Sequence, residues 1–272
     1  MPISGFPIYL STLLLEKNRA NGKGPSLLVS DWMEPVGEAG FAGLEIWTNN
    51  LLLASRSEWD LIKEKSLEAD LALALVSPNL PADASDKSRR LREAILEACE
   101  YFRPEGIKFT PSSNPRTQAE PGATRDALEF FKDWAKDIPR DVRLVYDGGE
   151  GSGLAGLLEA RKILTGGRFQ AVLHPFLLSP QLLGEALDAL GDFVGNLGAL
   201  AKRGDQLILL GENKDEHFKV IAMTRKKTYK GTWSVESTKG MGMPGENIDK
   251  MFDNAEKDLN FLIEALSRSA ER

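Results

Sequence analysis

Short apolar runs alternate with longer stretches of helical period along the chain. This alternation predicts parallel strands joined by crossover helices, because a strand covered on both faces is apolar throughout whereas a surface helix is apolar on one side only. The strands are expected at 8–14, 42–47, 71–77, 106–110, 142–147, 169–174, 206–211 and 232–237. The helices are expected at 26–39, 57–68, 86–103, 124–137, 154–164, 180–202, 216–227 and 246–267.

Eight such units in 272 residues predict an α/β protein with one (β/α)₈ TIM barrel, a fold that takes about 250 residues. An open doubly wound sheet has the same periodicity and is the alternative. No linker or low-complexity tract divides the chain, so one domain over 1–272 is expected. The functional residues of a barrel lie where its strands end, and the loops 111–122 and 148–153 would border that face.

Composition narrows the range of partners. The 34 basic and 40 acidic residues give a net charge of −6, which opposes binding to a nucleic-acid backbone. No apolar run reaches the roughly 18 residues of a membrane span, and no basic segment precedes the first apolar run. The single cysteine, Cys99, falls at a packing position of a helical pattern. A cytoplasmic protein without nucleic-acid or membrane partners is therefore expected.

Two stretches resemble a known superfamily. Residues 38–47 (EAGFAGLEIW) resemble the first helix and second strand of the xylose-isomerase-like barrels, and residues 229–236 (YKGTWSVE) are similar to the run into their eighth strand. The resemblance implies a sugar or sugar-phosphate isomerase or epimerase in carbohydrate metabolism. Such an enzyme moves a proton of a small polyhydroxylated substrate with the help of a divalent metal, manganese or magnesium. Barrels of this superfamily also often form homo-oligomers.

In the superfamily the metal is held by Glu, Asp, His and Glu at the ends of strands five to eight. Matched by position, Glu236 is the last of these, and Asp147 is a shorter carboxylate in place of the first. His174 stands where the superfamily has Asp, while the expected His falls at Leu209, with Glu212 as the nearest substitute. The resemblance thus implies a metal site of these four polar residues, with Glu236 and Asp147 as acid and base.

Other interpretations of these residues stay open. Asp147 precedes a glycine pair, where aspartate commonly caps a turn, and a lone histidine such as His174 is often structural. The leucine at position 209 motivates the alternative that the barrel has lost the metal site. The chain would then be a metal-independent enzyme or a binding protein for a small polar ligand. Two histidines and an acidic net charge argue against the third alternative, the superfamily's multi-zinc abasic-site endonucleases.

Four further residues are candidates for substrate binding: Glu45, Trp47, Lys108 and Lys239. A buried Glu45 requires a partner, and Lys108 could be that partner or could bind substrate. Trp47 would offer a sugar an apolar platform, or it would be ordinary packing. Lys239 begins a glycine-rich segment before the last helix, where barrels often hold phosphate, although Glu246 in that segment favours a plain capped loop.

Overall fold

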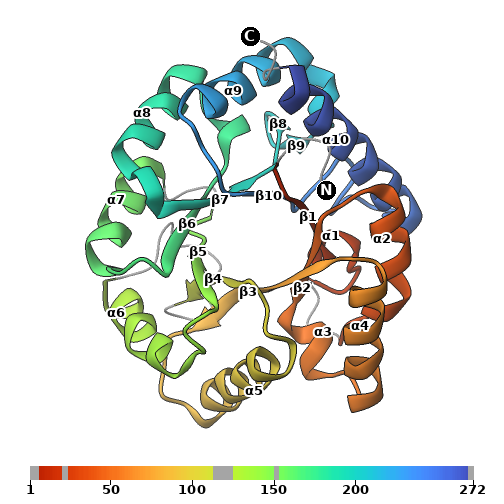
Figure 1. Ribbon diagram of the computed structural model, residues 1–272, viewed down its shortest axis with the longest axis vertical. Coiled ribbons are helices and arrows are strands. Elements are labelled where there is room, and N and C mark those ends of the chain that lie inside the picture. The colour runs from red at the N-terminus through yellow and green to blue at the C-terminus, as the bar shows by residue number, and fades with distance from the viewer. Residues whose placement is uncertain (1–5, 20–23, 113–124, 150–152, 269–272) are drawn as a thin grey trace.

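A computed structural model describes residues 6–19, 24–112, 125–149 and 153–268. Within them eight parallel strands form a closed barrel surrounded by helices (Figure 1), and β1 closes the ring by pairing with β10. The fold is therefore a (β/α)₈ TIM barrel and not an open sheet. The barrel strands are β1 (Ile8–Ser11), β2 (Gly43–Trp47), β3 (Ala72–Pro81), β4 (Gly106–Ser112), β5 (Arg143–Tyr146), β6 (Phe169–Leu173), β7 (Val194–Gly198) and β10 (Thr232–Val235).

The outer helices follow the predicted order. They are α2 (Met33–Ala39), α4 (Arg56–Glu68), α5 (Asp86–Phe102), α6 (Arg125–Trp134), α7 (Gly153–Ile163), α8 (Pro180–Leu190), α9 (Lys214–Lys226) and α10 (Ile248–Arg268). The shorter helical segments are α1 (Thr12–Leu15), α3 (Thr48–Leu52), η1 (Val29–Trp32), η2 (Ala135–Asp137), η3 (Pro175–Leu177), η4 (Gly191–Phe193) and η5 (Leu210–Asn213). No helix in the described ranges is long and apolar enough to cross a membrane. The predicted loop at 111–122 lies largely outside the described residues, as does the middle of the loop at 148–153.

The prediction of the seventh strand was wrong. Residues 206–211 do not enter the barrel: β9 (Gln206–Leu207) pairs antiparallel with β8 (Lys202–Arg203), and η5 follows. The barrel strand β7 lies instead inside the predicted helix 180–202. That helix ends early because Gly191 has a φ of +53°, a backbone conformation that side-chain-bearing residues rarely adopt and that interrupts the helical hydrogen-bond pattern. The apolar run after residue 206 belongs to a hairpin and a turn.

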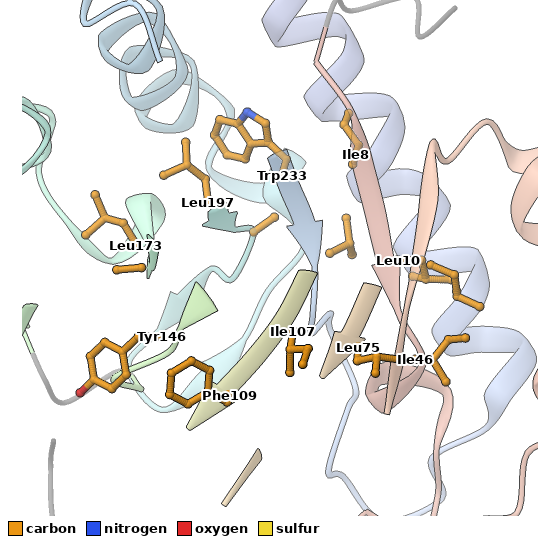
Figure 2. Packing of buried hydrophobic residues seen from close by; sticks show 14 of the residues in the cluster. Ile8, Leu10, Ile46, Leu75, Ile107, Phe109, Tyr146, Leu173, Leu197 and Trp233 are labelled. Atoms are coloured by element: carbon orange, nitrogen blue, oxygen red, sulfur yellow. The ribbon is translucent and has the colours of Figure 1, made fainter. Parts of the chain in front are cut away.

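The two sides of each strand differ in chemistry. Along β2, Leu44 and Ile46 are fully buried in the apolar layer between strands and helices, part of which Figure 2 shows. Glu45 and Trp47 lie on the opposite side of the strand and face the barrel interior. Cys99 is fully buried on α5, and burial raises the pKa of its thiol to about 12, which confirms the packing role. Apolar packing therefore surrounds an interior that is partly charged.

Helix α10 holds two segments at the mouth of the barrel through one carboxylate. Asp258 Oδ1 accepts a hydrogen bond from the Leu210 N–H at 2.7 Å, and Asp258 Oδ2 accepts one from Thr238 Oγ1 at 2.7 Å. His217 Nδ1 lies 2.7 Å from the carbonyl oxygen of the same residue, Leu210. These contacts tie η5 and the segment after β10 to the helix.

Asp258 should make the stability of the fold depend on pH. Burial raises the pKa of its carboxyl from 3.8 to about 7. Between these values the folded chain keeps a proton that the unfolded chain releases, so the free energy of unfolding should fall as the pH rises from about 4 to about 7, by on the order of 3 kcal/mol. Urea unfolding at pH 5 and pH 8 measures this difference. Asp258→Asn should reduce it, whereas Asp253→Asn, at an exposed position of the same helix, should leave it unchanged. An unaltered pH dependence in Asp258→Asn would contradict the assignment.

Candidate active site: carboxylates, a histidine and a lysine at the barrel mouth

Three of the four predicted metal ligands meet at one end of the barrel. Asp147 directly follows β5, His174 directly follows β6 and Glu236 directly follows β10. Each offers one ligand atom, and these atoms all lie within 4.8 Å of one another. The convergence follows from the fold, because the carboxyl ends of parallel barrel strands open on the same face.

The fourth predicted ligand, Glu212, lies elsewhere. It belongs to η5, and one of its carboxylate oxygens lies 2.7 Å from Lys239 Nζ near the surface. It is not part of the group of three within the described residues. The reason is the misassigned strand: since 206–211 is not a barrel strand, the residue after it does not project into the barrel mouth.

A buried lysine connects Glu236 to the barrel interior. Lys108 on β4 is 4% exposed, and its Nζ donates to Glu236 Oε1 at 2.6 Å and to Glu45 Oε2 at 2.9 Å. The partner expected for Glu45 is therefore present. Ser234 Oγ donates to Glu45 Oε1 at 2.5 Å, and Asn196 Nδ2 donates to Ser234 Oγ at 2.6 Å. These hydrogen bonds run from Asn196 in the barrel interior to Glu236 at the mouth, and they limit the orientation of the Glu236 carboxylate.

The charges of these groups follow from burial and from their neighbours. Burial alone would lower the pKa of Lys108, but Glu236 and Glu45 outweigh it and raise that pKa. The side chain therefore remains an ammonium, and an ammonium has no lone pair with which to form a Schiff base. Burial raises the pKa of the Glu236 carboxyl, and Lys108 and His174 oppose this effect.

Asp147 and His174 adjust each other's protonation. His174 Nε2 lies 3.6 Å from Asp147 Oδ1. Burial disfavours the charged forms of both, but their mutual attraction outweighs it: the pKa of Asp147 is lowered and that of His174 is raised. Asp147 Oδ1 also accepts the Gly149 N–H at 2.8 Å, so the aspartate caps the turn and belongs to the cluster at the same time.

The group of three suits a divalent cation in its chemistry. Two carboxylates and an imidazole are ligands that manganese, magnesium and zinc accept to different degrees. His174 Nδ1 is buried and has no hydrogen-bond partner within the described residues. Such an atom is costly unless a ligand satisfies it. The residues present therefore fit a metal, with Lys108 as a neighbouring positive charge that reduces the negative charge of the site.

An open cavity of about 680 Å³ lies above Glu236. This volume is in the range of small-molecule sites, roughly 300–1,000 Å³. Its polar lining consists of Glu236, Ser237, Arg19, Lys202, Lys239, Asp205 and Gln206, and its apolar lining includes Leu13, Leu200, Leu207, Met241 and Met243. His174 lines a separate apolar cavity of about 210 Å³ beside α7 and α8. The larger cavity is the candidate substrate site.

The remaining predicted binding residues have distinct positions. Trp47 is buried on the interior side of β2, two residues beyond Glu45 towards the mouth. Lys239 lies at the cavity lining but pairs with Glu212. The Glu246 carboxylate accepts from Arg19 Nη1 at 2.7 Å and from the Gly242 N–H at 2.6 Å, so the chain's own carboxylate occupies the anion-binding groups of this segment.

Sequence reasoning missed Asn196, Gly198 and Ser234. Ser234 lies two residues before Glu236, and the period of two along a strand would have placed both on one face. Asn196 and Gly198 were hidden because their strand was taken for part of a helix. The available signal was the sequence VGNLG after Gly191, whose glycines argue against a continuing helix.

The closed barrel, with a polar cluster where its strands end, is a (β/α)₈ TIM barrel that is similar in fold to solved xylose isomerase domain proteins. No protein-family model and no curated protein sequence matches the chain. Among solved structures it is similar to D-psicose 3-epimerase from Clostridium cellulolyticum H10, with a TM-score of 0.72 and 16% identity over 96% of this chain and 99% of that one.

Two further structures have the same fold. A xylose isomerase domain protein from Alicyclobacillus acidocaldarius has a TM-score of 0.65 and 13% identity over 96% of this chain and 99% of that one. The IolI protein with a bound zinc atom has a TM-score of 0.65 and 11% identity over 96% of this chain and 98% of that one. At these identities the similarity establishes the fold, and the chemistry has to be argued from the site.

Proposed function

We propose that this protein is a sugar isomerase or epimerase that uses a divalent metal held by Asp147, His174 and Glu236. The observation that carries the proposal is the convergence of these three side chains within 4.8 Å at the end of the barrel where the 680 Å³ cavity opens. The similarity in fold to D-psicose 3-epimerase and to zinc-bound IolI supports it.

The chain's residues divide the work of proton transfer. A bound metal would stabilise the negative charge that develops on a substrate oxygen when a proton leaves the adjacent carbon. Glu236 is the base: burial raises its pKa towards the working pH, where a carboxylate exchanges protons most effectively. Asp147 is the second carboxylate: its lowered pKa keeps it ionised, so it would accept a proton, and a proton returned to the substrate would come from Glu236 after it has taken one up. Lys108 holds Glu236 in place through the 2.6 Å contact.

The lining of the cavity favours an unphosphorylated substrate. Arg19 pairs with Glu246, and Lys239 pairs with Glu212, so a phosphate group would have to displace a carboxylate in each case. Ser237 Oγ is buried at the cavity and has no hydrogen-bond partner within the described residues, which suits a substrate hydroxyl.

A metal-independent enzyme is the second candidate, and Lys108 is the observation that favours it. Its ammonium lies 2.6 Å from Glu236 and already places a fixed positive charge beside the proposed base. A preorganised cation of this kind could stabilise developing negative charge without a metal. If the chain were instead a binding protein, Lys108 and Glu236 would only fix the orientation of a polar ligand.

Metal titration combined with solvent exchange tests the proposal. Chelator-treated protein should bind one manganese, magnesium, cobalt or zinc ion per chain and unfold at a higher temperature with it. With metal, D-psicose or D-fructose in D₂O should gain deuterium at the carbon next to the carbonyl, detected by NMR. Exchange without metal would favour the second candidate. Failure of all four ions to bind would exclude the metal-dependent function.

A further inference from the structure

The last residue of β7, Gly198, lies directly against the His174 imidazole. A Cβ atom placed on Gly198 would lie 2.5 Å from His174 Nδ1, 2.7 Å from His174 Cε1 and 3.0 Å from Glu236 Oε1. Cβ atoms in proteins essentially never approach other heavy atoms to less than 3.0 Å. The φ of Gly198 is not in the left-handed region, so its backbone would accept any residue. Glycine is therefore needed here for its missing side chain and not for its backbone conformation.

The His174 ring reaches across the mouth from β6 to β7. On one edge, Nε2 lies 3.6 Å from Asp147 Oδ1, at the end of β5. On the other edge, Nδ1 and Cε1 face Gly198. The ring thus fills the volume that a side chain on the last residue of β7 would occupy. Since the imidazole is rigid and Nδ1 is two bonds from its own Cβ, the ring could yield to a Gly198 side chain only by rotating away.

We propose that Gly198 is the positioning residue for the nitrogen ligand of the site. Its missing side chain lets His174 of β6 enter the space above β7, next to Glu236, so that strand six supplies the imidazole. The expected effect of Gly198 on metal binding rests on the proposed function, whereas the placement of the His174 ring can be tested without metal. It makes residues 174 and 198 a pair in which only one can carry a side chain into this space.

The first test follows the histidine ring in the metal-free protein. The chain has two histidines, His174 and His217, so each imidazole can be followed in ¹⁵N-labelled protein by NMR. Gly198→Ala should shift the signals of His174 and leave those of His217, which binds the Leu210 carbonyl, unchanged. Gly211→Ala is the matched control, because a Cβ there would meet only Phe261 at 4.0 Å. Unchanged His174 signals in Gly198→Ala would overturn the inference.

The second test measures cobalt binding by absorption titration. Gly198→Ala should weaken binding at least tenfold, His174→Ala should do the same, and the double variant should be no weaker than His174→Ala, since the two contacts closer than 3.0 Å are with the ring and disappear with it. Additive losses would overturn the proposal. The exchanged variant His174→Asp/Gly198→His should regain a spectrum with a nitrogen ligand, because removing one imidazole vacates the volume for the other. A spectrum without nitrogen ligation would count against it.

The outcomes separate this inference from the proposed function. If the wild-type protein binds no metal, the proposed function fails, and the NMR test alone decides the role of Gly198. If the wild type binds metal and Gly198→Ala binds it equally well, the inference fails and the function stands. If Gly198→Ala does not fold, recovery of folding in Gly198→Ala/His174→Ala would support the steric conflict. An equally unfolded double variant would contradict it.

Discussion

Replacing Lys108 by methionine should lower the free energy of unfolding by about 3–5 kcal/mol near neutral pH, the usual cost of removing one partner from a buried ion pair. Lys108 is 4% exposed and contacts Glu236 at 2.6 Å and Glu45 at 2.8 Å. Methionine fills a similar volume but leaves two carboxylates in the barrel without a cation. Urea unfolding at pH 7 measures the loss.

The control for this substitution is Lys136→Met. Lys136 pairs with Asp133 at 2.7 Å, but both side chains are 75% exposed and screened by solvent, so its removal should leave the free energy of unfolding nearly unchanged. The loss in Lys108→Met should shrink as the pH falls, because protonation then neutralises Glu236, whose pKa is raised by burial. Adding Glu45→Gln should recover part of it. If Lys108→Met were as stable as the wild type, the buried charge network would not exist in solution.

Substituting Glu236 by glutamine should abolish most of the proposed chemistry. Glutamine keeps the shape of the side chain and an oxygen that accepts from Lys108, but it is neither a base nor an anionic ligand. Deuterium exchange into a ketose should therefore fall by about 10²–10⁴-fold, the usual effect of losing a general base. Manganese should bind at least tenfold more weakly. Both are measured by NMR and by metal titration on the same samples.

Glu212→Gln is the matched control for Glu236→Gln. The sequence offered both glutamates as ligands, but Glu212 lies with Lys239 away from the group of three. Metal affinity and exchange in this variant should stay within about twofold of the wild type. If metal affinity and exchange fell equally in the two variants, Glu212 would have to be a residue of the site. Full exchange in Glu236→Gln would move the role of base to another group.

The sequence predicted most of the architecture because strand and helix periods are local properties. Seven of the eight barrel strands lie within a few residues of the apolar runs that indicated them. The exception, β7, has the sequence VGNLG, in which Asn196 and Gly198 replace the apolar residues that mark other strands. Its barrel-facing positions serve the site and not the core. Periodicity therefore failed where the strand presents polar and small residues to the candidate site instead of apolar ones.

Part of the candidate site was also predicted, because the ends of strands are local features of the sequence. Asp147, His174 and Glu236 each directly follow a strand, and a strand end is visible in sequence. Glu212 was included only because the strand before it was misassigned. Lys108 was one of two open alternatives, the partner of Glu45 or a substrate-binding residue. Its contact with Glu236 joins residues 128 positions apart, and no local pattern indicates such a pair.

By itself, the sequence determined that strands and helices alternate along the chain and that Glu236 stands at the end of the last strand, because both depend on the spacing of apolar residues. The tertiary structure decided that the sheet closes into a barrel. Only the tertiary structure decided which polar residues share the mouth. Closure of the ring brings the ends of β5, β6, β7 and β10 together, and there Gly198 leaves room for an imidazole from the neighbouring strand. Distances across a barrel depend on the register between strands and on the volume that side chains exclude, and no local sequence pattern determines either of them.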